Sequence, residues 1–272
     1  MAAGTETGAA RAGRVRLGPY MVNRLGFGAM RLTGPGIIGE PERPDEARAV
    51  LRRAVELGVD LIDTAHSYGP EVSERLIGET LRPYPDGLVI ATKSGLARSV
   101  NGGWYADCRP EVLRRECERS LELLGLDAIP LFPLHTVDRT VPYEESVGAL
   151  VDLQREGKIV AIGVSNVNAA QLRRAMAVAD VVSVQNRLPA GGAGQDEVLA
   201  ICEAEGIPFL PWFPLGAGRL AREGGEGPGT PAQRAIAWLL RRSPVMLPIP
   251  GTSSVAHLEE NIAAVELLED PR

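Results

Sequence analysis

Short apolar runs alternate along the chain with longer segments whose apolar residues recur at helical spacing. The eight runs begin near Leu25, Asp60, Leu88, Ile129, Ile159, Val181, Pro208 and Val245. The seven intervals average about 31 residues, which matches the length of one strand–helix–strand unit. This regular alternation predicts eight parallel strands, each followed by a helix.

Amphipathic helices are predicted between these runs, most clearly over residues 45–57, 110–124 and 143–156. Each of the three is followed by a glycine, a common helix-ending residue. Eight strand–helix pairs fit a closed barrel or a long doubly wound sheet. The even spacing and uniform composition favour the barrel, so the expected fold is a (β/α)8 TIM barrel of the α/β class.

Two short segments before the first strand, residues 15–17 and 20–23, predict a β-hairpin that plugs one end of the barrel. Residues 1–13 are rich in Ala, Gly and Thr and are interpreted as a flexible tail. Residues 14–272 are then expected to form a single barrel domain.

Composition limits the possible partners and location. The net charge of −6 argues against binding to nucleic acid or to an anionic membrane surface, and no run of about 18 apolar residues predicts a membrane span. Three cysteines without CxxC spacing suggest neither a disulfide framework nor a zinc site, which favours a cytoplasmic protein. The three histidines also lack ligand-like clustering, so no metal is expected.

Candidate chemistry lies where the apolar runs end, because barrel enzymes build their sites at the carboxyl ends of the strands. Asp63, Lys93 and His135 each close such a run, and Tyr68 follows Asp63 by five residues. Taken singly, the acid could cap a turn, and the tyrosine and histidine could be packed core residues. Lys93 needs a carboxylate, which Asp63 would supply. We expect the cation to lower the pKa of Tyr68, so that the phenol donates a proton to a carbonyl oxygen that His135 orients.

At these residues the chain resembles the aldo-keto reductases over essentially its whole length. The segments that carry the resemblance are DTAHSY at 63–68, VIATK at 89–93, LHTVD at 134–138, GVSN at 163–166 and QN at 185–186. The resemblance implies that Asp63, Tyr68, Lys93 and His135 form a catalytic tetrad. It also implies reversible hydride transfer between a nicotinamide cofactor and a carbonyl or alcohol.

The resemblance further implies a set of cofactor-binding residues. In it Ser165, Asn166 and Gln185 hold the nicotinamide carboxamide and Trp212 stacks on the ring. The full set is Gly28, Met30, Ser165, Asn166, Gln185, Trp212, Phe213, Leu215, Gly251, Ser253, His257 and Asn261. Gly251 and His257 stand where many members have Lys and Arg. The resemblance implies NADPH, and these departures weaken that preference and leave NADH possible, because an imidazole is only partly charged near pH 7.

Substrate choice is predicted less directly. Met30 and Trp104, with the neighbouring Tyr105, would line the pocket of a small carbonyl substrate. Within the family, the sequences of segments such as 212–216 and 250–257 most resemble those of the branch that includes bacterial pyridoxal reductases. The short, Gly-rich stretches 187–195 and 218–230 and the short C-terminal segment imply a pocket that is open or completed by a partner subunit. Alternatives are a ketoreductase for a sugar or natural-product intermediate and a non-catalytic nicotinamide-binding module; a monomer and a homo-oligomer are both compatible with the sequence.

Overall fold

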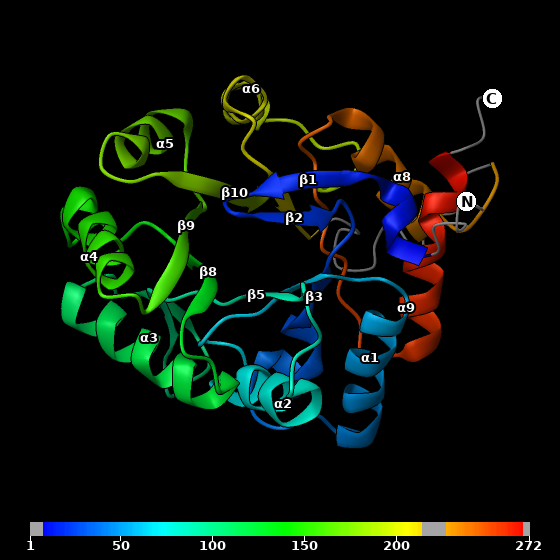
Figure 1. The fold of residues 1–272 in the computed structure, drawn as a ribbon, viewed down its shortest axis with the longest axis horizontal. Helices are drawn as coiled ribbons and strands as arrows, with labels where there is room; N and C mark the ends of the chain where they lie inside the picture. The colour runs from blue at the N-terminus through cyan, green and yellow to red at the C-terminus, as the bar shows by residue number, and fades with distance from the viewer. Residues whose placement is uncertain (1–7, 214–226, 269–272) are drawn as a thin grey trace.

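A parallel sheet of seven strands curls into most of a barrel in the computed structural model, which describes residues 8–213 and 227–268 (Figure 1). Neighbouring strands run in the order β11-β10-β9-β8-β5-β4-β3. The strands are β3 (Phe27–Gly28), β4 (Leu61–Asp63), β5 (Val89–Ala91), β8 (Ile129–Leu134), β9 (Ile159–Ser165), β10 (Val181–Arg187) and β11 (Phe209–Trp212). Each begins within two residues of a predicted apolar run, so the predicted α/β barrel class is confirmed.

The eighth predicted strand is replaced by an irregular segment over residues 245–250, which nevertheless closes the ring. On one side the amide of Leu247 donates to the carbonyl of Phe209 in β11. On the other side the amides of Gly26 and Gly28 donate to the carbonyls of Pro248 and Pro250. A proline has no amide hydrogen and cannot sustain a regular ladder, which explains why the run near Val245 forms a seam and not a strand.

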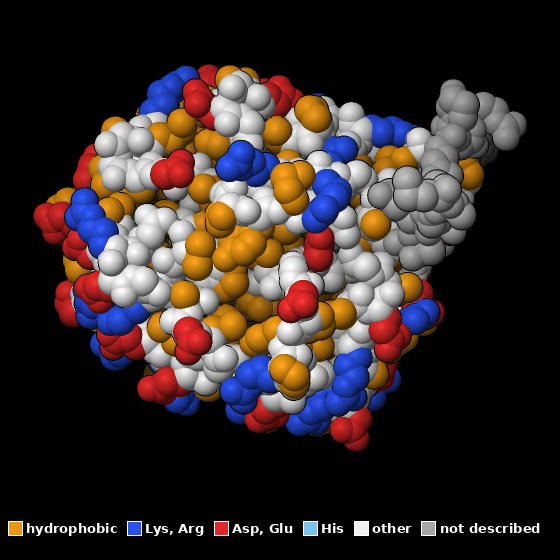
Figure 2. Space-filling view, viewed as in Figure 1, with side chains coloured by type: hydrophobic (Ala, Val, Ile, Leu, Met, Phe, Trp, Pro, Cys, Tyr) orange, Lys and Arg blue, Asp and Glu red, His pale blue; other side chains and the backbone are white. Residues whose placement is uncertain are grey.

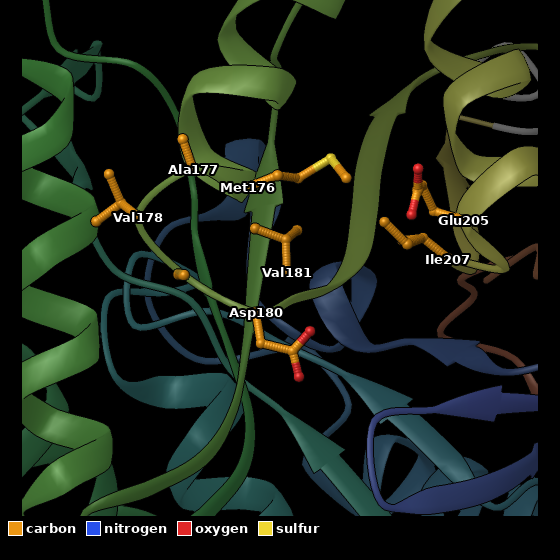
Figure 3. Close-up of a pocket in the computed structure, with 8 residues that line it drawn as sticks. Met176, Ala177, Val178, Asp180, Val181, Glu205 and Ile207 are labelled. Carbon is orange, nitrogen blue, oxygen red and sulfur yellow. The ribbon is translucent and has the colours of Figure 1, made fainter.

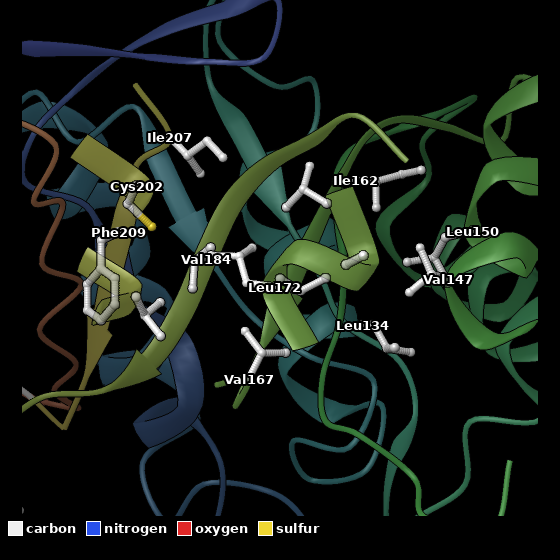
Figure 4. Packing of buried hydrophobic residues seen from close by; sticks show 14 of the residues in the cluster. Leu134, Val147, Leu150, Ile162, Val167, Leu172, Val184, Cys202, Ile207 and Phe209 are labelled. Atoms are coloured by element: carbon white, nitrogen blue, oxygen red, sulfur yellow. The ribbon is translucent and has the colours of Figure 1, made fainter. Parts of the chain in front are cut away.

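Helices cover the outer surface of the sheet, as the periodicity predicted. They are α1 (Pro44–Glu56), α2 (Val72–Leu81), α3 (Pro110–Leu124), α4 (Tyr143–Arg155), α5 (Ala169–Met176), α6 (Asp196–Glu205), α8 (Pro231–Arg242) and α9 (Val255–Ile262). Figure 4 shows the packing on one side, where Leu172 of α5 and Val147 of α4 meet Ile162 of β9. These apolar contacts hold the helices on the sheet and leave the strand ends to carry polar groups.

The predicted hairpin forms from β1 (Arg14–Leu17) and β2 (Tyr20–Asn23), and it crosses the amino-terminal end of the barrel (Figure 1). Leu17 and Val22 belong to the same buried cluster as Leu131 and Leu210, which come from the strands inside the barrel. The hairpin therefore plugs this end, as expected. Figure 2 views the same face and shows hydrophobic side chains gathered in its middle.

The start of the chain differs from the loose tail expected over residues 1–13. Residues Gly8–Ala12 form a 3-10 helix in which Ala9 and Ala12 are buried. The amide of Ala9 donates to the carbonyl of Leu57 at the end of α1. The two alanines supply apolar contact to the cluster beneath α1, so this segment belongs to the domain and not to a tail.

A cavity of about 350 Å³ lies at the amino-terminal end of the barrel, where β10 and β11 begin (Figure 3). Met176 from α5 and Ile207 from the loop before β11 extend toward each other in it, with Asp180 and Glu205 nearby. Barrel enzymes carry their chemistry at the opposite end, so we place the functional site elsewhere.

The closure of the ring depends on a glycine. A Cβ atom added to Gly28 would lie 2.7 Å from the carbonyl oxygen of Ile249 in the seam. We expect Gly28→Ala to lower the free energy of unfolding by about 1–3 kcal/mol, because the backbone must move apart. The control is Gly148→Ala in α4, where no atom lies within 4 Å and a gain of about 0.5–1 kcal/mol is expected. Urea unfolding of both variants measures the difference, and wild-type stability of Gly28→Ala would contradict the tight closure.

Candidate active site

Four side chains predicted from the sequence meet at the carboxyl-terminal end of the barrel. Asp63 ends β4, Lys93 follows β5 by two residues, and His135 follows β8 directly. Tyr68 comes from the loop between β4 and α2. All four are largely buried, with exposed fractions between 0 and 7%. Such a concentration of polar groups inside a domain requires specific partners.

Lys93 and Asp63 form an ion pair, and neighbouring groups make further hydrogen bonds to both of its members. The ammonium donates to Asp63 Oδ2 and to the carbonyl oxygen of Thr64, both at 2.7 Å. The second oxygen of Asp63 accepts from the amide of Gln185 at 2.9 Å. Burial alone would lower the pKa of Lys93, but the adjacent carboxylate raises it, so the ammonium stays charged.

Tyr68 lies beside this pair, and its acidity differs from the expectation. The Lys93 ammonium is 5.2 Å from the centre of the Tyr68 ring. Burial raises the pKa of Tyr68 above its ordinary value of 10.0, and Lys93 offsets this only in part while Asp63 adds to it. The expected lowering was therefore wrong, because it considered the cation and neglected desolvation and the paired carboxylate. The phenol is protonated near neutral pH.

His135 is an uncharged imidazole next to the phenol. Its ring meets the Tyr68 ring edge-on, with centres 5.8 Å apart. Burial and the Lys93 charge together hold the pKa of His135 well below 6.5. Its Nδ1 atom is buried and has no hydrogen-bond partner among the described residues. An unpaired buried polar atom is costly, and one at a strand end is suited to contact a ligand.

Two buried carboxylates that the sequence analysis missed hold the residues on either side of Lys93. Glu74 of α2 accepts a hydrogen bond from the hydroxyl of Thr92, and Glu116 of α3 accepts from the hydroxyl of Ser94 at 2.6 Å. Glu74 is 0% and Glu116 8% exposed. The available signal was a glutamate on the inward face of each predicted helix. Through these contacts α2 and α3 fix the end of β5, and with it the position of Lys93.

The residues expected at the nicotinamide lie together beside His135. The side-chain amide of Asn166 donates to the backbone carbonyl of His135 and accepts from the indole of Trp212. Asn166 has a positive φ of 58°, which turns the chain sharply after β9. The hydroxyl of Ser165 is buried without a partner among the described residues. Phe213 packs edge-on against Trp212, and Leu215 lies outside the described residues.

The expected phosphate and adenosine residues lie beside the seam, apart from the four buried side chains. Gly251 is close to Gly28, where a Cβ atom would meet the Gly28 carbonyl. Ser253 precedes α9, while exposed His257 and buried Asn261 lie within it. The exposed start of this helix, with amide and hydroxyl donors, is suited to an anionic group. The residues present therefore fit a dinucleotide that runs from Trp212 towards α9.

The two expected substrate residues lie at the rim. Met30 is partly buried in the 3-10 helix Ala29–Leu32 that follows β3. Trp104 is 42% exposed in a small hairpin formed by β6 (Leu96–Arg98) and β7 (Trp104–Ala106). The guanidinium of Arg98 stacks over the Trp104 ring at 3.9 Å. This stacking holds the indole in one orientation on the loop after β5.

The fold and these buried polar strand ends define an α/β-barrel enzyme. The chain belongs to the aldo/keto reductase family, whose model matches residues 24–229 and 224–271. It is 44% identical over 270 residues to an uncharacterized oxidoreductase of Schizosaccharomyces pombe, covering 97% of this chain and 88% of that protein. It is 41% identical over 263 residues to pyridoxine 4-dehydrogenase of Escherichia coli, covering 92% of each. The family predicted from the motifs is confirmed.

Solved structures give the same assignment. An aldo/keto reductase from Klebsiella pneumoniae in complex with NADP and acetate superposes with a TM-score of 0.80 at 26% identity, covering 95% of this chain and 91% of that one. A glycerol dehydrogenase from Gluconobacter oxydans shares the fold, with a TM-score of 0.83 at 22% identity over 95% of this chain and 90% of that one. Among the described residues no helix is long and apolar enough to span a membrane.

Two histidines near the site are expected to give opposite pH dependences of stability. The low pKa of His135 means that acidification below about 6.5 protonates this imidazole in the unfolded chain first, so stability is lost as the pH falls. Burial lowers the pKa of His66, but Glu74 and other nearby carboxylates raise it overall, so its contribution is lost as the pH rises above 6.5.

We therefore expect His135→Gln to flatten the fall in the free energy of unfolding below pH 6.5, by at most about 1.4 kcal/mol per pH unit. We expect His66→Gln to remove a decline above pH 6.5. Urea titrations between pH 5 and 8.5 measure both profiles. Profiles parallel to that of the wild type would show that neither imidazole is perturbed by the fold.

Proposed function

We propose that this protein reduces an aldehyde or ketone to an alcohol with NADPH as the preferred cofactor. The observation that carries the proposal is the buried group of Asp63, Tyr68, Lys93 and His135 at the carboxyl ends of the strands. A protonated phenol and a neutral imidazole at one opening can both contact a single carbonyl oxygen. Such a pair polarises the carbonyl and supplies the proton that reduction requires.

Tyr68 acts as the general acid in this proposal. Because burial keeps the phenol protonated, it donates a proton to the carbonyl oxygen as negative charge develops there. The Lys93 ammonium beside the ring stabilises the phenolate that remains. Asp63 keeps the ammonium in place and charged, and so acts through Lys93 as a positioning residue.

His135 orients the substrate. A neutral imidazole has one N–H donor, and a donor aimed at the carbonyl oxygen fixes the angle at which the carbonyl carbon is presented. Asn166 binds the backbone of His135, so the imidazole and the expected nicotinamide site are held by one side chain. Reversal of the same proton transfers would serve the oxidation of an alcohol.

The cofactor supplies the hydride when it is bound. Ser165 offers a buried hydroxyl that has no partner in the described part of the chain, and Asn166 and the Trp212 indole, which bond to each other, lie beside it. The Klebsiella pneumoniae aldo-keto reductases that resemble this chain were solved with NADP and with NADPH. His257 and Ser253 at α9 are the residues that would receive the 2′-phosphate of NADPH.

For the substrate we propose a flat, ring-shaped carbonyl compound such as pyridoxal. The support is the similarity to pyridoxine 4-dehydrogenase and the aromatic Trp104 held by Arg98 at the rim. A sugar or natural-product ketone is the second candidate, favoured by the exposure of that rim. A panel of aldehydes and ketones, including pyridoxal, assayed with NADPH and NADH tests the proposal. If the wild-type protein binds NADPH and reduces none of these compounds, the proposal is wrong and the protein is better explained as a non-catalytic nicotinamide-binding module.

The role of Tyr68 can be separated from folding and from cofactor binding. Tyr68→Phe removes the proton donor and should lower kcat by roughly 10²-fold or more, while the dissociation constant of NADPH stays near that of the wild type. Lys93→Met should also lower kcat, and it should cost about 3–5 kcal/mol of stability because Asp63 is left buried without a cation. Cofactor absorbance, fluorescence quenching and urea unfolding measure these three quantities. Undiminished turnover in Tyr68→Phe would remove the phenol from the mechanism.

The role of His257 predicts a change in cofactor preference. Replacing it with Arg supplies a permanent charge and a forked donor for the 2′-phosphate. We expect His257→Arg to tighten NADPH binding several-fold and His257→Ala to weaken it, with NADH binding changed little in both. Fluorescence titrations with the two cofactors measure this ratio. Equal effects on NADH and NADPH would place the 2′-phosphate away from His257.

A further inference from the structure

A second cavity, of about 510 Å³, opens at the same end of the barrel as the four buried side chains. Its walls are the segments that follow three neighbouring strands, β8, β9 and β10. The lining residues include Thr136, Arg139, Asn168, Gln171, Arg187 and Gln195. Among the described residues that line it none carries a carboxylate, while two are arginines. The cavity is therefore positively charged and rich in neutral hydrogen-bonding groups.

The side chains of the two arginines are not used by the fold. Arg139 and Arg187 are exposed, and within the described residues neither side chain makes a hydrogen bond or ion pair. Other surface arginines form ion pairs with carboxylates. The guanidinium of Arg174, for example, donates two hydrogen bonds to the carboxylate oxygens of Glu144, at 2.6 and 2.7 Å. In a chain with a net charge of −6, two unpaired guanidinium groups beside one cavity are available to a ligand.

The cavity adjoins the proposed reaction centre. Asn166 forms part of its wall, and the same side chain donates to the backbone of His135 and accepts from Trp212. Thr136, the residue after His135, is another part of the wall. The cavity and the proposed reaction centre therefore share a wall, which is formed by Asn166 and the residue that follows His135.

We propose that this cavity binds an anionic group, a carboxylate or phosphate, carried by the carbonyl substrate, with Arg139 and Arg187 as the residues that select it. The inference rests on the proposed carbonyl reduction and narrows the flat, ring-shaped substrate proposed above to one that also carries an acidic group, which pyridoxal itself lacks. Guanidinium groups match the planar or tetrahedral oxygens of these anions through paired N–H donors. The start of α5, at Asn168, adds the positive end of a helix dipole on the same side.

Matched aldehydes test the selection. We would compare 4-carboxybenzaldehyde and 4-formylphenyl phosphate with the uncharged methyl 4-formylbenzoate in the wild type, Arg139→Gln, Arg187→Gln and the double variant. The ratio of kcat/KM for an anionic aldehyde to that for the ester should fall about tenfold for each arginine, with the change mainly in KM. The preferred anion in the wild type distinguishes a carboxylate from a phosphate. Arg155→Gln, which changes an exposed arginine at the end of α4 near the start of β9, is the control and should keep the wild-type ratio.

A binding measurement separates this inference from the proposed function. Calorimetry with 4-carboxybenzaldehyde and NADP+, which allows no reduction, should show binding to the wild type that weakens with added salt and at least tenfold in the double variant. Such binding without any turnover in the assay would refute carbonyl reduction and keep the anion site. Equal binding by wild type and double variant, or an equal loss of activity towards acid and ester, would overturn the anion site. A matching loss of NADPH affinity would assign the arginines to the cofactor and would also overturn it.

Discussion

The ion pair of Lys93 and Asp63 is the interaction on which the rest of the site depends. An ammonium with no exposed surface is tolerated only where acceptors surround it, and here they come from Asp63 and the carbonyl of Thr64. Gln185, which lies 122 residues after Asp63 in the chain, donates a hydrogen bond to the second oxygen of the Asp63 carboxylate. One buried charge thus fixes the relative positions of β4, β5 and β10, and the same burial keeps Tyr68 protonated and His135 neutral.

The helices contribute to this arrangement with more than apolar contact. Glu74 and Glu116 reach inwards from α2 and α3 and hold the hydroxyl groups on either side of Lys93. Each carboxylate is itself shielded from water, so its hydrogen bonds are strong and its loss would leave a buried donor unsatisfied. The proposed reaction centre is therefore supported from behind by the packing of two helices. The loops in front, including Trp104, are free to differ in shape without disturbing it.

The sequence predicted what has a strong periodic or positional signal. The strand starts and the helix over Pro110–Leu124 follow from apolar spacing and Gly125, and Asp63, Lys93 and His135 follow from their places at strand ends. The eighth strand was wrong because prolines remove ladder donors, and Ala9 and Ala12 were missed because small residues carry little hydrophobic signal. The pKa of Tyr68 depends on burial, and the charge of the cavity depends on Arg139, from the segment after β8, and Arg187, from the end of β10, lining the same cavity. Neither property is local in the chain.

The seam at residues 245–250 joins the first strand of the barrel, β3, to the last, β11. The hydrogen bond across it from Arg24 to the carbonyl of Met246 connects residues 222 positions apart. Bringing such distant segments together costs the most chain entropy, so these contacts gain stability only after the intervening strands are in place. We therefore expect the barrel to be completed late in folding, at the step that brings Gly28 against Gly251. The surface proposed for the dinucleotide would then form as the ring closes, and a chain without the seam would lack that surface too.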